Sequence, residues 1–132
     1  MRIEFFLPMV PPTVTHQEKR ISVRSGKPVV YEDARLRVAR ALLRDHLAGH
    51  RPDVPFQGAV MLCVKWCFPR GRHRDGQYRS TRPDTDNLQK LLKDVMTELG
   101  FWNDDAQVAS EIAEKFWAEI SGLYVCVQEI RS

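Results

Sequence analysis

Residues 82–100 have the sequence RPDTDNLQKLLKDVMTELG, and this stretch decides how the second half of the chain folds. Apolar side chains recur in it at helical spacing, which predicts an amphipathic helix with one buried face. Asp86, with Gln89 three residues later, has the form of an N-cap with a capping-box glutamine. Gly100 is placed to end the helix. The stretch therefore puts two aspartates, Asp84 and Asp86, at the beginning of a helix.

Alternating apolar side chains on either side of this helix predict strands. The expected elements, in chain order, are a strand at residues 2–7, a hairpin at 21–24 and 27–31 around a Ser25-Gly26 turn, a helix at 32–49, a strand at 57–68, the helix at 87–99, and strands at 107–118 and 123–130. This order predicts an α+β fold, a small mixed sheet with two helices.

The composition fits one globular domain spanning residues 1–132. The chain has 132 residues, 43% hydrophobic and 28% charged, which is enough to bury a core. Three cysteines, Cys63, Cys67 and Cys126, stand in apolar strand-like runs and predict buried thiols of a reducing compartment. No run of about 18 apolar residues is present. We therefore expect a cytoplasmic protein with no membrane partner.

Positive charge gathers just before the helix at 87–99. From Lys65 to Arg82 the chain carries six basic side chains and a single acid, Asp75. A one-sided basic stretch is the electrostatic footprint of a protein that binds a phosphate backbone, although many surface loops carry solvated arginines. The candidate DNA-binding residues are Arg70, Arg72, Arg74, Arg79 and Arg82.

The aspartates have the pattern of a site for a hard divalent cation. Alternate residues of an extended segment point the same way, so the carboxylates of Asp84 and Asp86 can converge on one ion. A second acidic pair, Asp104-Asp105, follows the predicted helix. Oxygen ligands of this kind suit Mg²⁺ or Mn²⁺ better than Zn²⁺. Because such ions activate water and stabilise a phosphate under attack, the pattern indicates a metal-dependent nuclease, with Lys90 placed to neutralise the phosphate.

The length of the predicted helix creates a difficulty of reach. A helix over residues 87–99 is about 20 Å long, and the six steps from Leu99 to Asp105 span at most about 21 Å when fully extended. A return of Asp105 to Asp84 within one chain is therefore barely possible. Either the helix is shorter or bent, or Asp105 completes the site of a partner subunit.

These residues resemble the RusA family of Holliday junction resolvases. The resemblance is carried by residues 84–90, DTDNLQK, and residues 100–108, GFWNDDAQV. It implies a homodimeric endonuclease of RusA-like α+β fold that requires Mg²⁺ or Mn²⁺ and cuts four-way DNA junctions by paired nicks during recombination and repair. The family's catalytic and metal-binding residues correspond to Asp84, Asp86, Asp105 and Lys90, with Asp104 as an accessory metal ligand.

Two alternatives remain open at the level of the sequence. In the first, the aspartates only cap a helix and pair with nearby arginines in a noncatalytic, architectural DNA-binding dimer. In the second, the metal nuclease acts on flaps, forks or other branched DNA. The variant Asp86→Asn separates the first alternative from an enzyme, because it removes cutting only if the site is catalytic.

Overall fold

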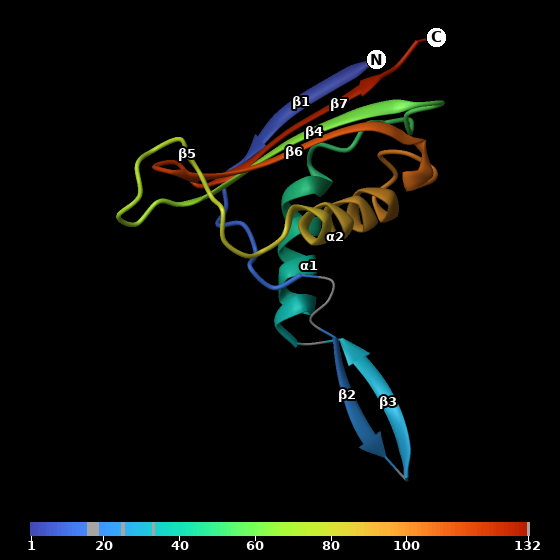
Figure 1. Ribbon diagram of the computed structural model, residues 1–132. Helices are drawn as coiled ribbons and strands as arrows, with labels where there is room; N and C mark the ends of the chain where they lie inside the picture. The colour runs from blue at the N-terminus through green and yellow to red at the C-terminus, as the bar shows by residue number, and fades with distance from the viewer. Residues whose placement is uncertain (16–18, 25, 33, 132) are drawn as a thin grey trace.

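The computed structural model describes residues 1–15, 19–24, 26–32 and 34–131. In chain order its elements are β1 (Arg2–Leu7), β2 (Lys19–Arg24), β3 (Lys27–Glu32), α1 (Ala34–Ala48), β4 (Val60–Pro69), β5 (Gln77–Tyr78), α2 (Thr85–Glu98), the short 3-10 helix η1 (Asp105–Gln107), β6 (Val108–Ala118) and β7 (Gly122–Glu129). Five strands form one sheet in the order β1-β7-β4-β6-β5. Figure 1 shows α1 and α2 on one side of this sheet.

The predicted α+β fold, a mixed sheet with two helices, is confirmed. Neighbouring strands are antiparallel except for β4 and β6, which are parallel and are connected through α2. The helix expected at residues 32–49 begins at Ala34, because Glu32 still belongs to β3; Asp33, between them, lies outside the described residues. The strand β5 was not expected, because two residues carry no periodic pattern.

The β2–β3 hairpin was expected and is present. The two strands pair antiparallel from Lys19 opposite Glu32 to Arg24 opposite Lys27. In Figure 1 this hairpin projects away from the sheet and the helices. Ser25, half of the expected turn, lies outside the described residues.

The core lies between the sheet and the helices. Alternate residues of the central strand β4 are buried, as the period of a half-covered strand requires. The helix α2 buries one face against them. The fully buried residues of β4 are Val60, Leu62, Val64, Trp66 and Phe68, and those of α2 include Leu88, Leu91, Leu92, Val95 and Met96.

The helix α2 runs antiparallel to β6. Near its beginning, the Lys115 Nζ of β6 donates a hydrogen bond to the Pro83 carbonyl at 2.7 Å. In its middle, Gln89 donates to Glu111 of β6 at 2.7 Å. At its end, Gly100 adopts φ 82 and the Phe101 N–H bonds the Met96 carbonyl at 3.0 Å, a Schellman-type stop. The chain then passes through η1 to the start of β6.

The cysteines do not all lie where the sequence predicted. Cys126 is buried, but Cys63 and Cys67 are half-buried. Both alternate with the buried residues of β4, so they lie on the face of the sheet turned away from the helices. Among the described residues, no helix has both the length and the apolar character needed to span a membrane.

Candidate active site

The first acidic pair lies at the beginning of α2. Asp84 is the N-cap residue, with extended backbone (φ −76, ψ 145), and Asp86 lies in the first turn. Both side chains are exposed, and Lys90 is exposed one turn further along. The expectation that Asp86 caps the helix is wrong, because α2 already begins at Thr85. The Asp84 side chain makes no capping hydrogen bond either, so neither carboxylate caps the helix.

Gln89 is not the partner of a helix cap. It is buried, accepts a hydrogen bond from Trp66 Nε1 at 2.7 Å and donates to Glu111 at 2.7 Å. The capping box of this region lies instead at η1, where the Asp104 carboxylate accepts from the Ala106 N–H at 2.8 Å. In that box the Gln107 side chain accepts from the Asp104 N–H at 3.1 Å.

The two aspartates of the second acidic pair differ in whether their side chains are hydrogen-bonded. Asp104 is engaged as the cap of η1, whereas the Asp105 side chain is exposed and has no hydrogen bond or ion pair within the described part of the chain. Asp105 is therefore the better candidate of the two for a metal ligand. The role of Asp104 as an accessory ligand stays a prediction, and it would compete with the cap.

The two acidic pairs lie at opposite ends of α2. The helix has 14 residues, which corresponds to a length of about 21 Å. Across all described residues, no group of three His, Cys, Asp or Glu side chains lies close enough to hold a metal ion. One chain therefore places Asp84 and Asp86 at the beginning of α2 and leaves Asp105 beyond its other end. The sequence left two possibilities, a shorter or bent helix or an Asp105 that completes the site of a partner subunit. The helix is not shorter than predicted.

Two charged residues of β6 belong to the same region and were missed by the sequence analysis. Lys115 donates to the carbonyls of Thr81 and Pro83 at 2.6 and 2.7 Å, so it holds the segment that leads into Asp84. Burial, helped by the nearby Arg79, lowers the pKa of Lys115, while Asp84 opposes that shift.

Glu111 is the other residue that was missed. It accepts from Lys93 at 2.9 Å and, with Asp86 and Gln89, lines a hollow of about 300 Å³ between α2 and β6. Glu111 and Lys115 are in register with Leu62 and Trp66 of β4 and so share their helix-facing side. Both are charged residues at strand positions where the alternation of buried and exposed side chains predicts apolar residues. This departure from the pattern could have identified them in the sequence.

The candidate DNA-binding arginines fall into two groups. Arg70 pairs with Glu119 and donates to the His73 carbonyl at 3.0 Å, so its side chain holds the loop. Arg72, Arg74 and Arg82 are exposed, and within the described residues their guanidinium groups have no ion pair. These three are therefore the members best placed to meet a phosphate backbone.

The Arg79 side chain packs against aromatic rings and helps to hold the loop before Asp84. Its guanidinium lies 4.3 Å from the centroid of the Phe68 ring and 4.4 Å from that of Trp117, and burial lowers its pKa. The group also donates to Thr81 Oγ1 at 3.1 Å and to the Arg82 carbonyl. The His73 ring stacks on the Trp117 ring, with 4.1 Å between the ring centroids. This stack ties the loop before Asp84 to the edge of the sheet.

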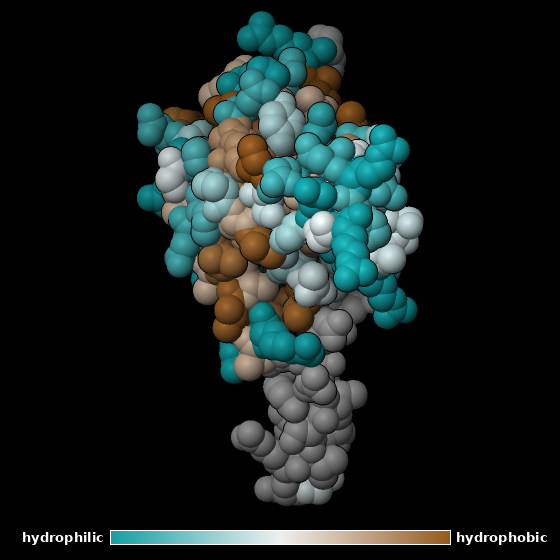
Figure 2. Space-filling view, turned by 90° about the vertical axis from the view of Figure 1, so that its left-hand side faces the viewer, coloured by the Kyte–Doolittle hydropathy of each residue, from teal (hydrophilic) through white to brown (hydrophobic). Residues whose placement is uncertain are grey.

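The surface at this end of the molecule is mixed. Figure 2 looks at the side that carries β5 and the neighbouring loop, and it shows a hydrophilic area beside a band of hydrophobic residues. Tyr78 of β5 is 63% exposed there and donates to Glu114 at 2.8 Å.

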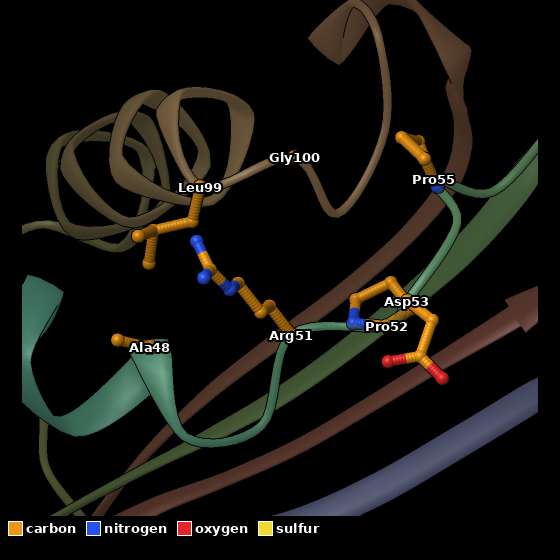
Figure 3. Close-up of a pocket in the computed structure, with 7 residues that line it drawn as sticks. All are labelled: Ala48, Arg51, Pro52, Asp53, Pro55, Leu99 and Gly100. Carbon is orange, nitrogen blue, oxygen red and sulfur yellow. The ribbon is translucent and has the colours of Figure 1, made fainter.

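A second hollow lies between the ends of α1 and α2 and has a volume of about 410 Å³. Figure 3 shows the Arg51 side chain extending across it toward Leu99, while the Asp53 carboxylate points away. This hollow is at the far end of α2 from Asp84 and Asp86. It holds no convergent acidic groups and is not part of the candidate site.

Comparisons with known proteins agree with the resemblance found in the sequence. Residues 9–128 match the family model described as Endodeoxyribonuclease RusA. The chain is 29% identical over 133 residues to the crossover junction endodeoxyribonuclease rusA of Lactococcus phage r1t, covering 98% of this chain and 100% of that protein. It is 27% identical over 129 residues to the uncharacterized protein YqaN of Bacillus subtilis (strain 168), covering 89% and 90%.

Proposed function

The chain belongs to the endodeoxyribonuclease RusA family, and we propose that it cuts four-way DNA junctions with a divalent cation, Mg²⁺ or Mn²⁺, held by Asp84, Asp86 and Asp105. The activity of a Holliday junction resolving endodeoxyribonuclease follows from the family and from the phage relative. The cation, its ligands and the homodimer are our proposals.

One observation carries the metal site. Asp84 and Asp86 are adjacent to a helix N-terminus, exposed, and free of the capping bond that an aspartate in such a place usually makes. Carboxylates that make no hydrogen bond are available to a hard cation, which prefers oxygen ligands. When bound, the cation supplies stabilisation of the phosphate charge and activation of water.

The protein side chains around the cation have separate tasks. Lys115 holds the backbone before Asp84 through two carbonyls, which orients the first carboxylate. Lys90, exposed on the same helix as Asp86, is available to neutralise charge on the scissile phosphate. Arg72, Arg74 and Arg82 guide the DNA backbone, so binding weakens as salt rises.

The architectural alternative has less support than the enzyme. It requires the aspartates to be occupied by caps and arginine pairs, yet the described residues provide neither for Asp84 or Asp86. A homodimer is also supported by the placement of Asp105, which is too far from Asp84 to share a cation within one chain. Two equivalent sites related by a two-fold axis suit a junction, because two matching strands must be nicked.

The test is cleavage of a synthetic four-way junction beside a linear duplex and a flap of the same sequence, in Mg²⁺ and in EDTA. We expect paired, metal-dependent nicks in the junction that Asp86→Asn abolishes while DNA binding is kept or tightened, because a carboxylate that repels phosphate is removed. Asp45→Asn, the same change at an exposed site on α1, is the matched control and should cut normally.

Two outcomes would change the proposal. Binding without cutting in either metal would favour the architectural dimer. Efficient cutting of the flap alone would keep the chemistry and discard the four-way junction as substrate.

A further inference from the structure

Two exposed aromatic rings lie at the β5 end of the sheet. The His73 ring, on the loop before β5, stacks on the Trp117 ring with 4.1 Å between the centroids and an angle of 2° between the ring planes. The Tyr78 ring, on β5 itself, stacks on the Phe116 ring at 4.7 Å. His73 is exposed, and Tyr78 is 63% exposed. Each of these two rings has one face fixed against the sheet, and in the described part of the chain no further ring is placed over it.

The two stacks lie on opposite faces of the sheet. Phe116 and Trp117 are consecutive in β6, and consecutive side chains of a strand point to opposite faces. Trp117 is in register with the buried Phe68, so it lies on the side of the helices. Phe116 is in register with the half-buried Cys67, on the side turned away from the helices. The edge of the sheet at β5 therefore carries one exposed ring on each of its faces.

Unpaired positive charge lies beside these rings. Arg72 and Arg74 flank His73 in the sequence, and their exposed guanidinium groups have no ion pair in the part of the chain that the structure describes. Acidic side chains at this end are engaged within the chain, namely those of Asp75, Glu114 and Glu119. Exposed rings beside free guanidinium groups are the combination that binds a nucleobase together with its phosphate.

The β5 edge also lies next to the candidate metal site. The Arg79 N–H, directly after β5, donates to the Lys115 carbonyl at 2.9 Å. The Lys115 Nζ donates to the Pro83 carbonyl at 2.7 Å, and Pro83 directly precedes Asp84. Lys115 is also the residue before Phe116 in β6. In Figure 1, the chain around β5 reaches past the end of the sheet and then returns to the beginning of α2. A base stacked at this edge would therefore belong to the nucleotides around the phosphate at the metal site.

We propose that the β5 edge is a wedge that enters the branch point of a four-way junction, where the exposed rings of His73 and Tyr78 stack on the base pairs that end two neighbouring arms. This inference rests on the proposed function, because it states how the four-way junction is recognised as substrate. A base pair inside a continuous duplex is covered on both faces by its neighbours, whereas a base pair at an opened branch point has one face free. Base–aromatic stacking is then gained at a junction and not on a linear duplex.

The arginines and the rings have different tasks in this arrangement. Arg72 and Arg74 contact phosphates, which are present in every duplex arm, so they contribute affinity for any DNA. The rings of His73 and Tyr78 contact bases that only a branch exposes, so they contribute selectivity. The two contributions can be separated by comparing one junction with one linear duplex.

Removal of each ring tests the wedge. His73→Ala and Tyr78→Ala should each weaken junction binding by roughly 5- to 150-fold, the range of one base–aromatic stack, and leave binding of a linear duplex of the same sequence unchanged. Binding is measured in EDTA, so that cutting does not interfere, and urea denaturation checks that each variant is folded. Tyr78→Phe keeps the ring and loses the hydrogen bond to Glu114, so it should bind the junction like the wild type. Val38→Ala, at a 68% exposed site on α1, is the matched control for the loss of an exposed apolar side chain.

Photochemical cross-linking shows which bases meet the rings. An iodinated uracil replaces thymine either at the branch point or well inside one arm, and long-wavelength ultraviolet light joins it to an aromatic ring stacked on it. We expect cross-links to His73 or Tyr78 from the branch point only, identified by mass spectrometry of the peptides. The cross-link to Tyr78 should disappear in Tyr78→Ala and persist in Tyr78→Phe.

The outcomes separate this inference from the proposed function. Arg72→Ala should weaken junction and duplex binding alike. If the ring variants also weaken both alike, or weaken neither, or if the branch-point uracil cross-links elsewhere, the wedge is wrong. Wild-type protein that does not prefer the junction to the duplex would instead defeat the proposed substrate. In that case a branch-point cross-link to His73 or Tyr78 would keep the base contact, and its absence would overturn the wedge as well.

Discussion

Replacing Arg79 by alanine should loosen the loop that leads into Asp84. The guanidinium lies between two aromatic rings and donates two hydrogen bonds to the loop. Each ring contact of a partly buried arginine is worth about 0.5–1 kcal/mol, and each hydrogen bond about 1 kcal/mol. After allowance for partial exposure, we expect Arg79→Ala to lower the free energy of unfolding by about 3 kcal/mol.

The assay combines urea denaturation with junction binding and cleavage. Arg79→Lys keeps the charge but loses the planar group that stacks between Phe68 and Trp117, so it should recover less than half of the lost stability. Arg72→Ala is the matched control, because that guanidinium is exposed and has no ion pair in the described residues. It should unfold like the wild type and bind DNA more weakly, with a smaller dependence on salt.

A different result would assign the Arg79 side chain to DNA binding. Suppose that Arg79→Ala unfolds within about 0.5 kcal/mol of the wild type, as an ordinary surface substitution does, and that only its affinity for DNA falls. The side chain would then contact DNA rather than hold the loop. Cleavage is expected to fall with stability in Arg79→Ala, because Thr81 and Arg82, its hydrogen-bond partners, lie just before Asp84.

Three further predictions concern the rest of the molecule. Gln89→Leu leaves the buried Trp66 N–H without an acceptor and should cost about 1–3 kcal/mol in urea denaturation; an unchanged midpoint would contradict this hydrogen bond. Glu98→Ala removes exposed ion pairs between α2 and α1 and should cost at most about 1 kcal/mol, a loss that vanishes in high salt; a larger, salt-independent loss would indicate packing. The hydrogen bond to Glu4 raises the pKa of Tyr124 to about 12. Between about pH 10 and 12 the folded protein therefore keeps the Tyr124 proton while the unfolded chain loses it. The stabilisation is complete below about pH 10 and disappears as pH rises through about 12. Ultraviolet titration against Tyr124→Phe measures it, and a normal tyrosine titration would contradict it.

The elements that could be predicted from the sequence are the long, periodic ones. The alternation in β4 and the helical spacing in α2 each extend over ten or more residues, so the buried face is overdetermined. The helix start was predicted less well. Asp86-x-x-Gln89 resembles a capping box, but Gln89 is buried and accepts a hydrogen bond from Trp66, a residue on the strand β4. A local pattern cannot reveal that competition, because the partner is distant in the sequence.

The candidate site shows the same division. The candidate carboxylates and the separation of the two acidic pairs could be predicted from residue types and from the length of the helix, both of which are local properties. The contributions of Glu111 and Lys115 depend on the parallel pairing of β6 with β4, which turns two charged side chains toward α2. Which of Asp104 and Asp105 is free also depends on tertiary structure, because the Gln107 side chain of the cap bonds the Phe56 carbonyl at 2.9 Å.

A site shared between subunits would connect assembly to chemistry. In the proposed dimer a single subunit holds the beginning of one site and the end of the other, so it cannot nick DNA before the second copy has joined it. A lone nick leaves a junction unresolved, whereas two symmetric nicks release two ligatable duplexes. Dimer assembly completes both sites in one event, because the two-fold axis makes each contact twice. The separation of Asp105 from Asp84 along α2 is then the feature that prevents premature cutting. Cleavage should accordingly rise more steeply than linearly with protein concentration below the dimer dissociation constant, and strict proportionality at every concentration would argue against this coupling.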